Sequence, residues 1–130
     1  MLDRRDYLLR QLQQFIDAII MKFTSIELEE KLYDPEEIGD LYRKYLQENR
    51  QFFIDSSTAE IIDFLQQNTL PENALAKMEI LAELLYGEGK ILRDTTLIKK
   101  AVELLEYNLK KSGVFDMQKM KRLKEMKEII

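Results

Sequence analysis

Two glutamates and a tyrosine are the side chains of this chain best spaced to do chemistry together. Glu79 and Glu83 stand four residues apart, so a helix could carry both on one face, and Tyr86 follows three residues later. Carboxylates beside a phenol in a pocket could bind a small ligand or transfer protons. The same spacing is also typical of a solvated helix face opposite buried leucines, and we favour this second interpretation for Glu79 and Glu83.

Other chemistry is limited by two residue types that the sequence lacks. The 130 residues include no histidine and no cysteine. Histidine is the most frequent general base near neutral pH and the commonest metal ligand, and the cysteine thiolate is both a nucleophile and a metal ligand. A catalytic triad with histidine therefore cannot form within the chain, and the carboxylates show no EF-hand spacing for calcium. We expect no catalytic residues, no metal site and no cofactor, and hence no enzyme.

Basic side chains are concentrated near the end of a chain whose net charge is −4. An exposed helix face of mixed charge explains them, because acids lie among them. The alternative is contact with nucleic acid or a membrane surface, but no aromatic residue interleaves with the cations, as stacking on bases would require. We therefore expect no nucleic-acid partner. The five cations are Lys119, Lys121, Arg122, Lys124 and Lys127.

Tyrosines and methionines are the remaining candidates for an interaction surface. Tyrosine is enriched at protein interfaces because its ring is apolar and its hydroxyl is polar. The same residues could instead edge the core with their hydroxyls in water. A stripe of methionines, Met117, Met120 and Met126, is typical of core packing, or of a helix that pairs with a second copy of the chain. The four candidates for partner binding are Tyr42, Tyr45, Tyr86 and Tyr107.

The elements expected to position these residues are all helices. Gly (4) and Pro (2) are scarce, strong helix formers are abundant, and no segment alternates polar and apolar residues as a strand does. We therefore predict an all-α fold of five to six antiparallel helices in a single domain over residues 1–130. The expected helix starts are Asp3 or Asp6, Asp34 before Pro35, a capping box from Ser57 to Glu60, Pro71, Asp94 and Asp116.

Apolar residues at spacings of three and four predict which helix faces form the core. These stripes cover residues 8–23, 38–46, 61–65, 75–85, 98–109 and 117–130. Three points stay open. The first helix could end at Thr24 or continue, residues 50–56 could be helix or turn, and Gly87 and Gly89 could end a helix or admit a neighbouring backbone.

The chain divides into two parts within its one domain. Residues 1–69 hold the N-terminal helices, and residues 70–130 hold a helical hairpin followed by a C-terminal helix. No apolar run approaches the ~20 residues needed to cross a bilayer, and the first residues do not form a signal peptide. We therefore expect no transmembrane segment and a cytoplasmic location.

Three segments carry a resemblance to known proteins. RRDYLLRQLQQFIDAI near the start, with LAELLYGEGKIL and AVELLEYNL downstream, resembles a family of short, all-helical bacterial proteins whose function is uncharacterised. Residues 71–111 also resemble a degenerate tetratricopeptide-type hairpin, although the connection at 89–94 is long and the N-terminal half shows no second copy at a ~34-residue period. The resemblance implies a scaffold of stacked helices, with tetratricopeptide-like stacking in the C-terminal half, and it implies no activity.

Amphipathic helices and spare aromatic residues, without a catalytic set, favour a function in binding. Our leading hypothesis is a non-enzymatic scaffold that binds a protein partner, or forms a homo-oligomer, through a helical groove. The alternative is a small-ligand-binding or carboxylate-based enzymatic domain that uses Glu79, Glu83 and Tyr86 in a pocket. Nucleic-acid binding through the last helix is a third alternative.

Overall fold

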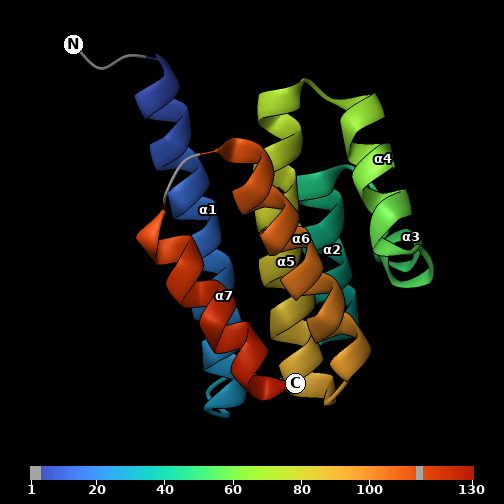
Figure 1. Ribbon diagram of the computed structural model, residues 1–130. Coiled ribbons are helices and arrows are strands. Elements are labelled where there is room, and N and C mark those ends of the chain that lie inside the picture. Colours follow the sequence, from blue (N-terminus) through green and yellow to red (C-terminus); the bar gives the residue numbers. More distant parts are fainter. Residues whose placement is uncertain (1–3, 114–115) are drawn as a thin grey trace.

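Helices account for all regular structure in residues 4–113 and 116–130, the part of the chain that this computed structural model describes (Figure 1). Within this part there are seven helices and no strand, so the all-α prediction is confirmed and the predicted five to six helices are too few. None of these helices has the length and apolarity to cross a membrane. The helices are α1 (Arg4–Glu27), α2 (Pro35–Leu46), α3 (Arg50–Asp55), α4 (Thr58–Asn68), α5 (Pro71–Leu92), α6 (Thr95–Ser112) and α7 (Met117–Ile129).

The short helix α3 occupies a segment that the sequence left open between helix and turn. Its Phe53 is fully buried and contacts three other rings, with centroid distances of 5.3 to 6.3 Å. The aromatic cluster orders the segment, because a buried phenylalanine fixes the short backbone stretch that carries it. The three neighbouring rings are Tyr42, Phe52 and Phe64.

Side-chain caps mark four helix starts where the sequence predicted them. Each cap accepts a hydrogen bond from an amide of the first turn, and the box between Ser57 and Glu60 is complete. The confirmed caps are Asp34, Ser57, Asp94 and Asp116.

The first helix differs from its predicted limits. Helix α1 is already regular at Arg4, so a cap at Asp6 is wrong, and Asp3 lies outside the described residues. The helix continues past Thr24 to Glu27, and the left-handed Glu29 (φ 61°) follows it.

Helix α5 is the central element, because it packs against α1, α2, α4 and α6. Every residue from Met78 to Gly89 is buried. A helix covered on all sides keeps no solvated face, so the apolar stripe predicted from Leu75 to Leu85 is only part of its buried surface. The interior therefore includes three glutamates of α5, which are Glu79, Glu83 and Glu88.

Helices α1 and α5 converge towards their C-terminal ends and diverge towards their N-terminal ends (Figure 1). Gly87 allows the close approach, because a Cβ atom there would overlap the ring of Phe23. Gly89 has the same role against α6, where a Cβ atom would lie 2.6 Å from Ile98 Cγ1. Neither glycine ends a helix, since α5 runs to Leu92. At the diverging end, the space between the two helices forms a groove.

Helix α7 packs less deeply than the others. Met126 is its one buried residue in the part of the chain that is described. Met117 and Met120 are exposed, so the core packing predicted for them is wrong. Ion pairs between its side chains and those of α5 therefore also attach this helix to the rest of the fold.

Candidate functional site

Glu79 and Glu83 are buried, so the solvated face that we predicted for them is wrong. Glu83 accepts hydrogen bonds from Arg122, with Nε 3.0 Å from Oε2 and Nη2 2.9 Å from Oε1. Glu79 pairs with Lys119, whose Nζ lies 3.4 Å from Oε2. Both cations belong to α7, so this helix neutralises two buried carboxylates of α5. A buried ion needs such a partner, because removing a charge from water is costly.

Tyr86 is buried and its ring contacts two cations. The ring centroid lies 4.8 Å from Arg122 Cζ and 4.4 Å from Lys90 Nζ, within the range of cation–π contacts. Burial raises the pKa of the Tyr86 hydroxyl, and the positive charge of Arg122 opposes that rise. Burial lowers the pKa of Arg122, but its hydrogen bonds to Glu83 outweigh this effect, and the net shift is upward. Cations of the same chain therefore contact both carboxylates and the ring of Tyr86.

A third buried carboxylate, Glu88, was missed in the sequence. It is 0% exposed and accepts hydrogen bonds from Tyr33 Oη at 2.8 Å, Tyr42 Oη at 2.7 Å and Arg50 Nε at 2.7 Å. Burial and the contact with Glu88 raise the pKa of Tyr33 to about 12, and the same causes raise that of Tyr42. The missed signal is its position, because Glu88 follows Leu81 by seven residues and so lies on the apolar stripe.

These three carboxylates are engaged by other side chains of the protein. Within the described residues, every buried side-chain nitrogen or oxygen has a hydrogen-bond partner. The contacts tie α3 and α7, and the segment before α2, to the central helix. These contacts stabilise the fold, so we look for a binding site on the surface of the protein.

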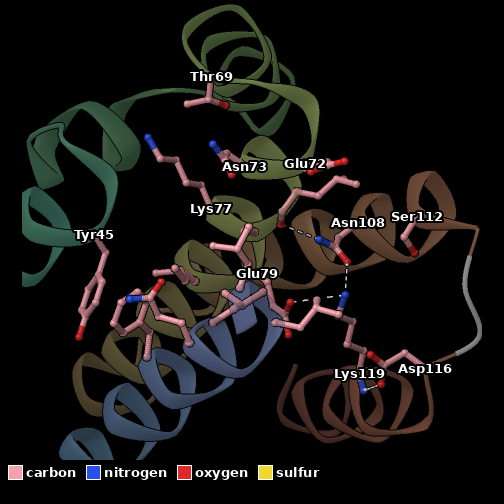
Figure 2. Close-up of a pocket in the computed structure, with 18 of the residues that line it drawn as sticks. Tyr45, Thr69, Glu72, Asn73, Lys77, Glu79, Asn108, Ser112, Asp116 and Lys119 are labelled. Carbon is pink, nitrogen blue, oxygen red and sulfur yellow. Dashed lines mark hydrogen bonds and ion pairs between the residues drawn. The ribbon is translucent and has the colours of Figure 1, made fainter. Parts of the chain in front are cut away.

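A groove of about 770 Å³ opens where α1 and α5 diverge, and the end of α6 and the start of α7 close its side (Figure 2). We call it the α1–α5 groove. Its volume is within the ~300–1,000 Å³ usual for binding pockets. The apolar side chains that line it are Leu8, Leu9, Leu12 and Phe15 of α1 and Leu75, Ala76 and Ile80 of α5.

The α1 side of the groove exposes large aliphatic side chains. Leu8 is 42% exposed and Leu9 is 54% exposed, whereas Leu12 and Phe15 are half-buried. Single exposed leucines are common on protein surfaces, but leucines grouped in a concave surface are typical of an interaction site.

A chain of polar contacts forms the side of the groove at α6 and α7. Lys119 Nζ donates to Asn108 Oδ1 at 3.0 Å, and Asn108 Nδ2 donates to the Leu75 carbonyl at 2.7 Å (Figure 2). Burial raises the pKa of Glu79, while the nearby Lys119 ammonium lowers it. Because these groups satisfy one another, they fix the shape of this side of the groove.

The opposite edge of the groove carries polar groups that have no partner among the described residues. Lys77 and Asn73 both line the groove, and no described side chain forms an ion pair or hydrogen bond with either of them (Figure 2). Burial lowers the pKa of the Lys77 ammonium. This edge therefore presents hydrogen-bond donors and a positive charge beside an apolar surface.

The four tyrosines predicted to bind a partner are in different environments. Tyr45 lines the groove and packs against Phe15, with ring centroids 5.1 Å apart. Tyr107 is half-buried and accepts a hydrogen bond from Gln66 Nε2 at 2.6 Å. Tyr42 and Tyr86 are buried, and their contacts lie within the protein. Partner binding through the four tyrosines stays a prediction.

The five cations of the last helix do not share one face. Lys119 and Arg122 are half-buried against α5, while Lys121, Lys124 and Lys127 are exposed. A smaller cavity of about 230 Å³ lies between α1 and α7, and Lys119 and Arg122 line it together with Glu79 and Glu83. Since two of the cations pair with these acids, the exposed basic face is smaller than the sequence indicated.

Comparisons with protein families, with curated proteins and with solved structures find no match for this chain. The resemblance to a bacterial family and the tetratricopeptide-like hairpin therefore stay predictions. Any functional assignment has to rest on the geometry of the α1–α5 groove.

Proposed function

We propose that this protein is a non-enzymatic helical scaffold that binds another protein, or a second copy of itself, through the α1–α5 groove. The observation that carries the proposal is the exposure of Leu8 and Leu9 beside a concave surface. Covering these side chains would remove apolar area from water, which is the main driving force of protein association. Tyr45, on the same groove, adds a ring and a hydroxyl of the kind enriched at interfaces.

The helical hairpin of α5 and α6 supports a scaffold role. These two helices share the most extensive contact in the described part of the chain and are joined by two residues, Arg93 and Asp94. Our proposal includes a tetratricopeptide-like stacking of this hairpin, since stacked helical hairpins create concave surfaces for partners. It also includes a cytoplasmic location, because the lack of cysteine suits a reducing compartment.

A matched pair of variants tests the proposal. Leu9→Asp places a charge on the groove, whereas Met21→Asp places one on the same helix at a residue that is 70% exposed and does not line the groove. Light scattering over a range of concentrations would measure self-association, and affinity capture from lysate would measure partner binding. We expect the wild type and Met21→Asp to behave alike and Leu9→Asp to lose the association.

Two results would refute the proposal. One is a wild-type protein that stays monomeric and retains no partner. The other is an equal loss in Leu9→Asp and Met21→Asp, which would place the interaction outside the groove. Circular dichroism of both variants would establish that the helices are intact.

A further inference from the structure

We infer that the occupant of the α1–α5 groove is an acidic amphipathic helix of a partner protein, which places two turns of apolar side chains against α1 and α5 and a carboxylate against Lys77. This inference rests on the function proposed above and specifies the chemistry of the partner.

The length of the apolar surface matches a short stretch of helix. Leu8, Leu12 and Phe15 follow one another at spacings of four and three residues, and span roughly 10 Å at 1.5 Å per residue. On the facing side, Leu75 and Ile80 are separated by about one and a half helical turns. Helices that bind in grooves present apolar residues at positions i, i+3, i+4 and i+7, which also span two turns.

The positive charge of Lys77 at the groove edge favours a ligand that carries a negative charge there. The ammonium of Lys77 has no partner among the described residues, and Asn73, one helical turn before it, lines the same groove (Figure 2). A carboxylate on the bound helix would accept charge-assisted hydrogen bonds from Lys77, which are stronger than those between neutral groups. A basic helix would instead place like charges together.

The other charged groups of the groove are one ion pair and two acids, Glu72 and Asp116, that have no cationic partner among the described residues. Glu79 and Lys119 neutralise each other, and Asp116 accepts a hydrogen bond from the Lys119 amide as the cap of α7. Glu72 also lines the groove, but it points away from Lys77 (Figure 2). An acid of the bound helix therefore fits the Lys77 edge and is repelled from the Glu72 edge, which orients the helix.

The exposed area favours a helix over a small amphiphile such as a fatty acid. Tyr7, which precedes the groove on α1, is 60% exposed, and Leu9 keeps more than half of its surface in water. A single acyl chain in the groove would leave much of this apolar area exposed. A helix with a diameter of about 10 Å would cover both the groove and its rim.

A selection from a display library tests the inference. The library consists of amphipathic helices with leucine at i, i+3, i+4 and i+7, in which the flanking positions vary among Glu, Gln and Lys. The baits are the wild type, Lys77→Glu and the control Lys99→Glu, which changes an exposed lysine of α6 outside the groove. We expect the wild type and Lys99→Glu to select glutamate at one flanking position, and Lys77→Glu to select lysine there.

Affinities of the best peptide provide the second measurement. For Lys77→Gln the dissociation constant should rise about tenfold, the loss expected for one hydrogen bond to a charged group. Leu9→Asp should abolish binding, which shows that the peptide uses the groove.

Each other outcome overturns the inference in a recognisable way. Peptides that need Leu9 but show no charge preference would refute the acidic partner and leave the proposed function standing. Selection of no peptide, together with a dimer that Leu9→Asp disrupts, would make a second copy of the chain the occupant. Selection of no peptide, together with decanoate binding that Leu9→Asp abolishes, would refute the protein partner as well.

Discussion

Glu88 shows how a single charged residue is accommodated in the core of a small protein. The carboxylate is fully buried, yet two hydroxyls and a guanidinium donate to it at 2.7 to 2.8 Å. These hydrogen bonds offset the cost of removing the charge from water, and their fixed directions favour one arrangement of the segments that supply them. The donors are Tyr33, Tyr42 and Arg50, which come from three different parts of the chain.

Alkaline pH should weaken the contacts of Glu88. The pKa of Tyr33 rises from 10.0 to about 12, chiefly through burial and next through its hydrogen bond to Glu88. Because the folded pKa is raised, the stabilising contribution of Tyr33 is complete below pH 10 and is lost as the pH rises towards 12. The free energy of unfolding, measured in urea, should therefore fall over this range in the wild type and fall less steeply in Tyr33→Phe. The exposed variant Tyr7→Phe should follow the wild type, and equal slopes in all three proteins would contradict the assignment.

The sequence predicted the spacing of the acidic residues but not their surroundings. Glu79 and Glu83 do share one side of a helix, and they are buried because α7 covers that side. Residue spacing specifies a face within one helix, whereas burial depends on which other helices pack there. For Glu88 the sequence contained a partial signal, since a glutamate seven residues after Leu81 lies on the same face as that leucine.

At the scale of the element, α7 depends on ion pairs as well as on apolar burial. Met126 and Leu123 pack against the core, and Lys119 pairs with Glu79, Arg122 with Glu83 and the exposed Lys127 with Glu106. Removing one partner of a buried pair is more damaging than removing both, because the remaining charge is left buried without compensation.

A double-mutant cycle between α5 and α7 tests this dependence. Arg122→Met keeps much of the side-chain volume but leaves the carboxylate of Glu83, which is 5% exposed, without its bidentate partner. We expect the variant to lose about 3 kcal/mol of the free energy of unfolding, as measured in urea. Adding Glu83→Gln should restore at least ~1 kcal/mol of this loss.

The control for this cycle is Lys121→Met, which changes an exposed lysine of the same helix and should have almost no effect. If the effects of Arg122→Met and Glu83→Gln on the free energy of unfolding simply added, the two side chains would not be coupled. Hydrogen exchange should also increase in α7 before it increases in α5, because the substitution first weakens the docking of the terminal helix.

Element boundaries were predictable where a local signal exists. A cap is a contact within four residues, so Asp34, Ser57, Asp94 and Asp116 could be recognised in the sequence alone. Helix α3 and the end of α1 lack such signals. Their limits depend on tertiary contacts, such as those of Phe53 with rings from α2 and α4.

At the scale of the whole molecule, the groove results from the angle between α1 and α5. The two helices touch at Gly87 and Phe23 and diverge towards their N-terminal ends (Figure 1). Apolar side chains of both helices, among them Leu8 and Leu75, line the space between them. An apolar stripe predicts that a helix packs on one side, but it does not predict the crossing angle. The groove and its lining by Lys77 were for this reason not predictable from the sequence.

The contact between Gly87 and Phe23 can be tested by comparing a glycine-to-alanine substitution at position 87 with the same substitution at position 39. Gly87→Ala and Gly39→Ala both replace a glycine inside a helix, where alanine is favoured by up to about 1 kcal/mol. At Gly39 no atom lies within 4 Å of the added carbon, so the variant should be more stable by about that amount. At Gly87 the added carbon would overlap the ring of Phe23, so α1 must move or the ring must leave its rotamer, at a cost of about 1–3 kcal/mol.

The two variants should therefore shift the urea midpoint in opposite directions. The double variant Gly87→Ala with Phe23→Leu should recover part of the loss, because a smaller side chain makes room for the new carbon. If Gly87→Ala were as stabilising as Gly39→Ala, then α1 and α5 would not be in contact at this point. The divergence of the two helices, and with it the groove, would then need another cause.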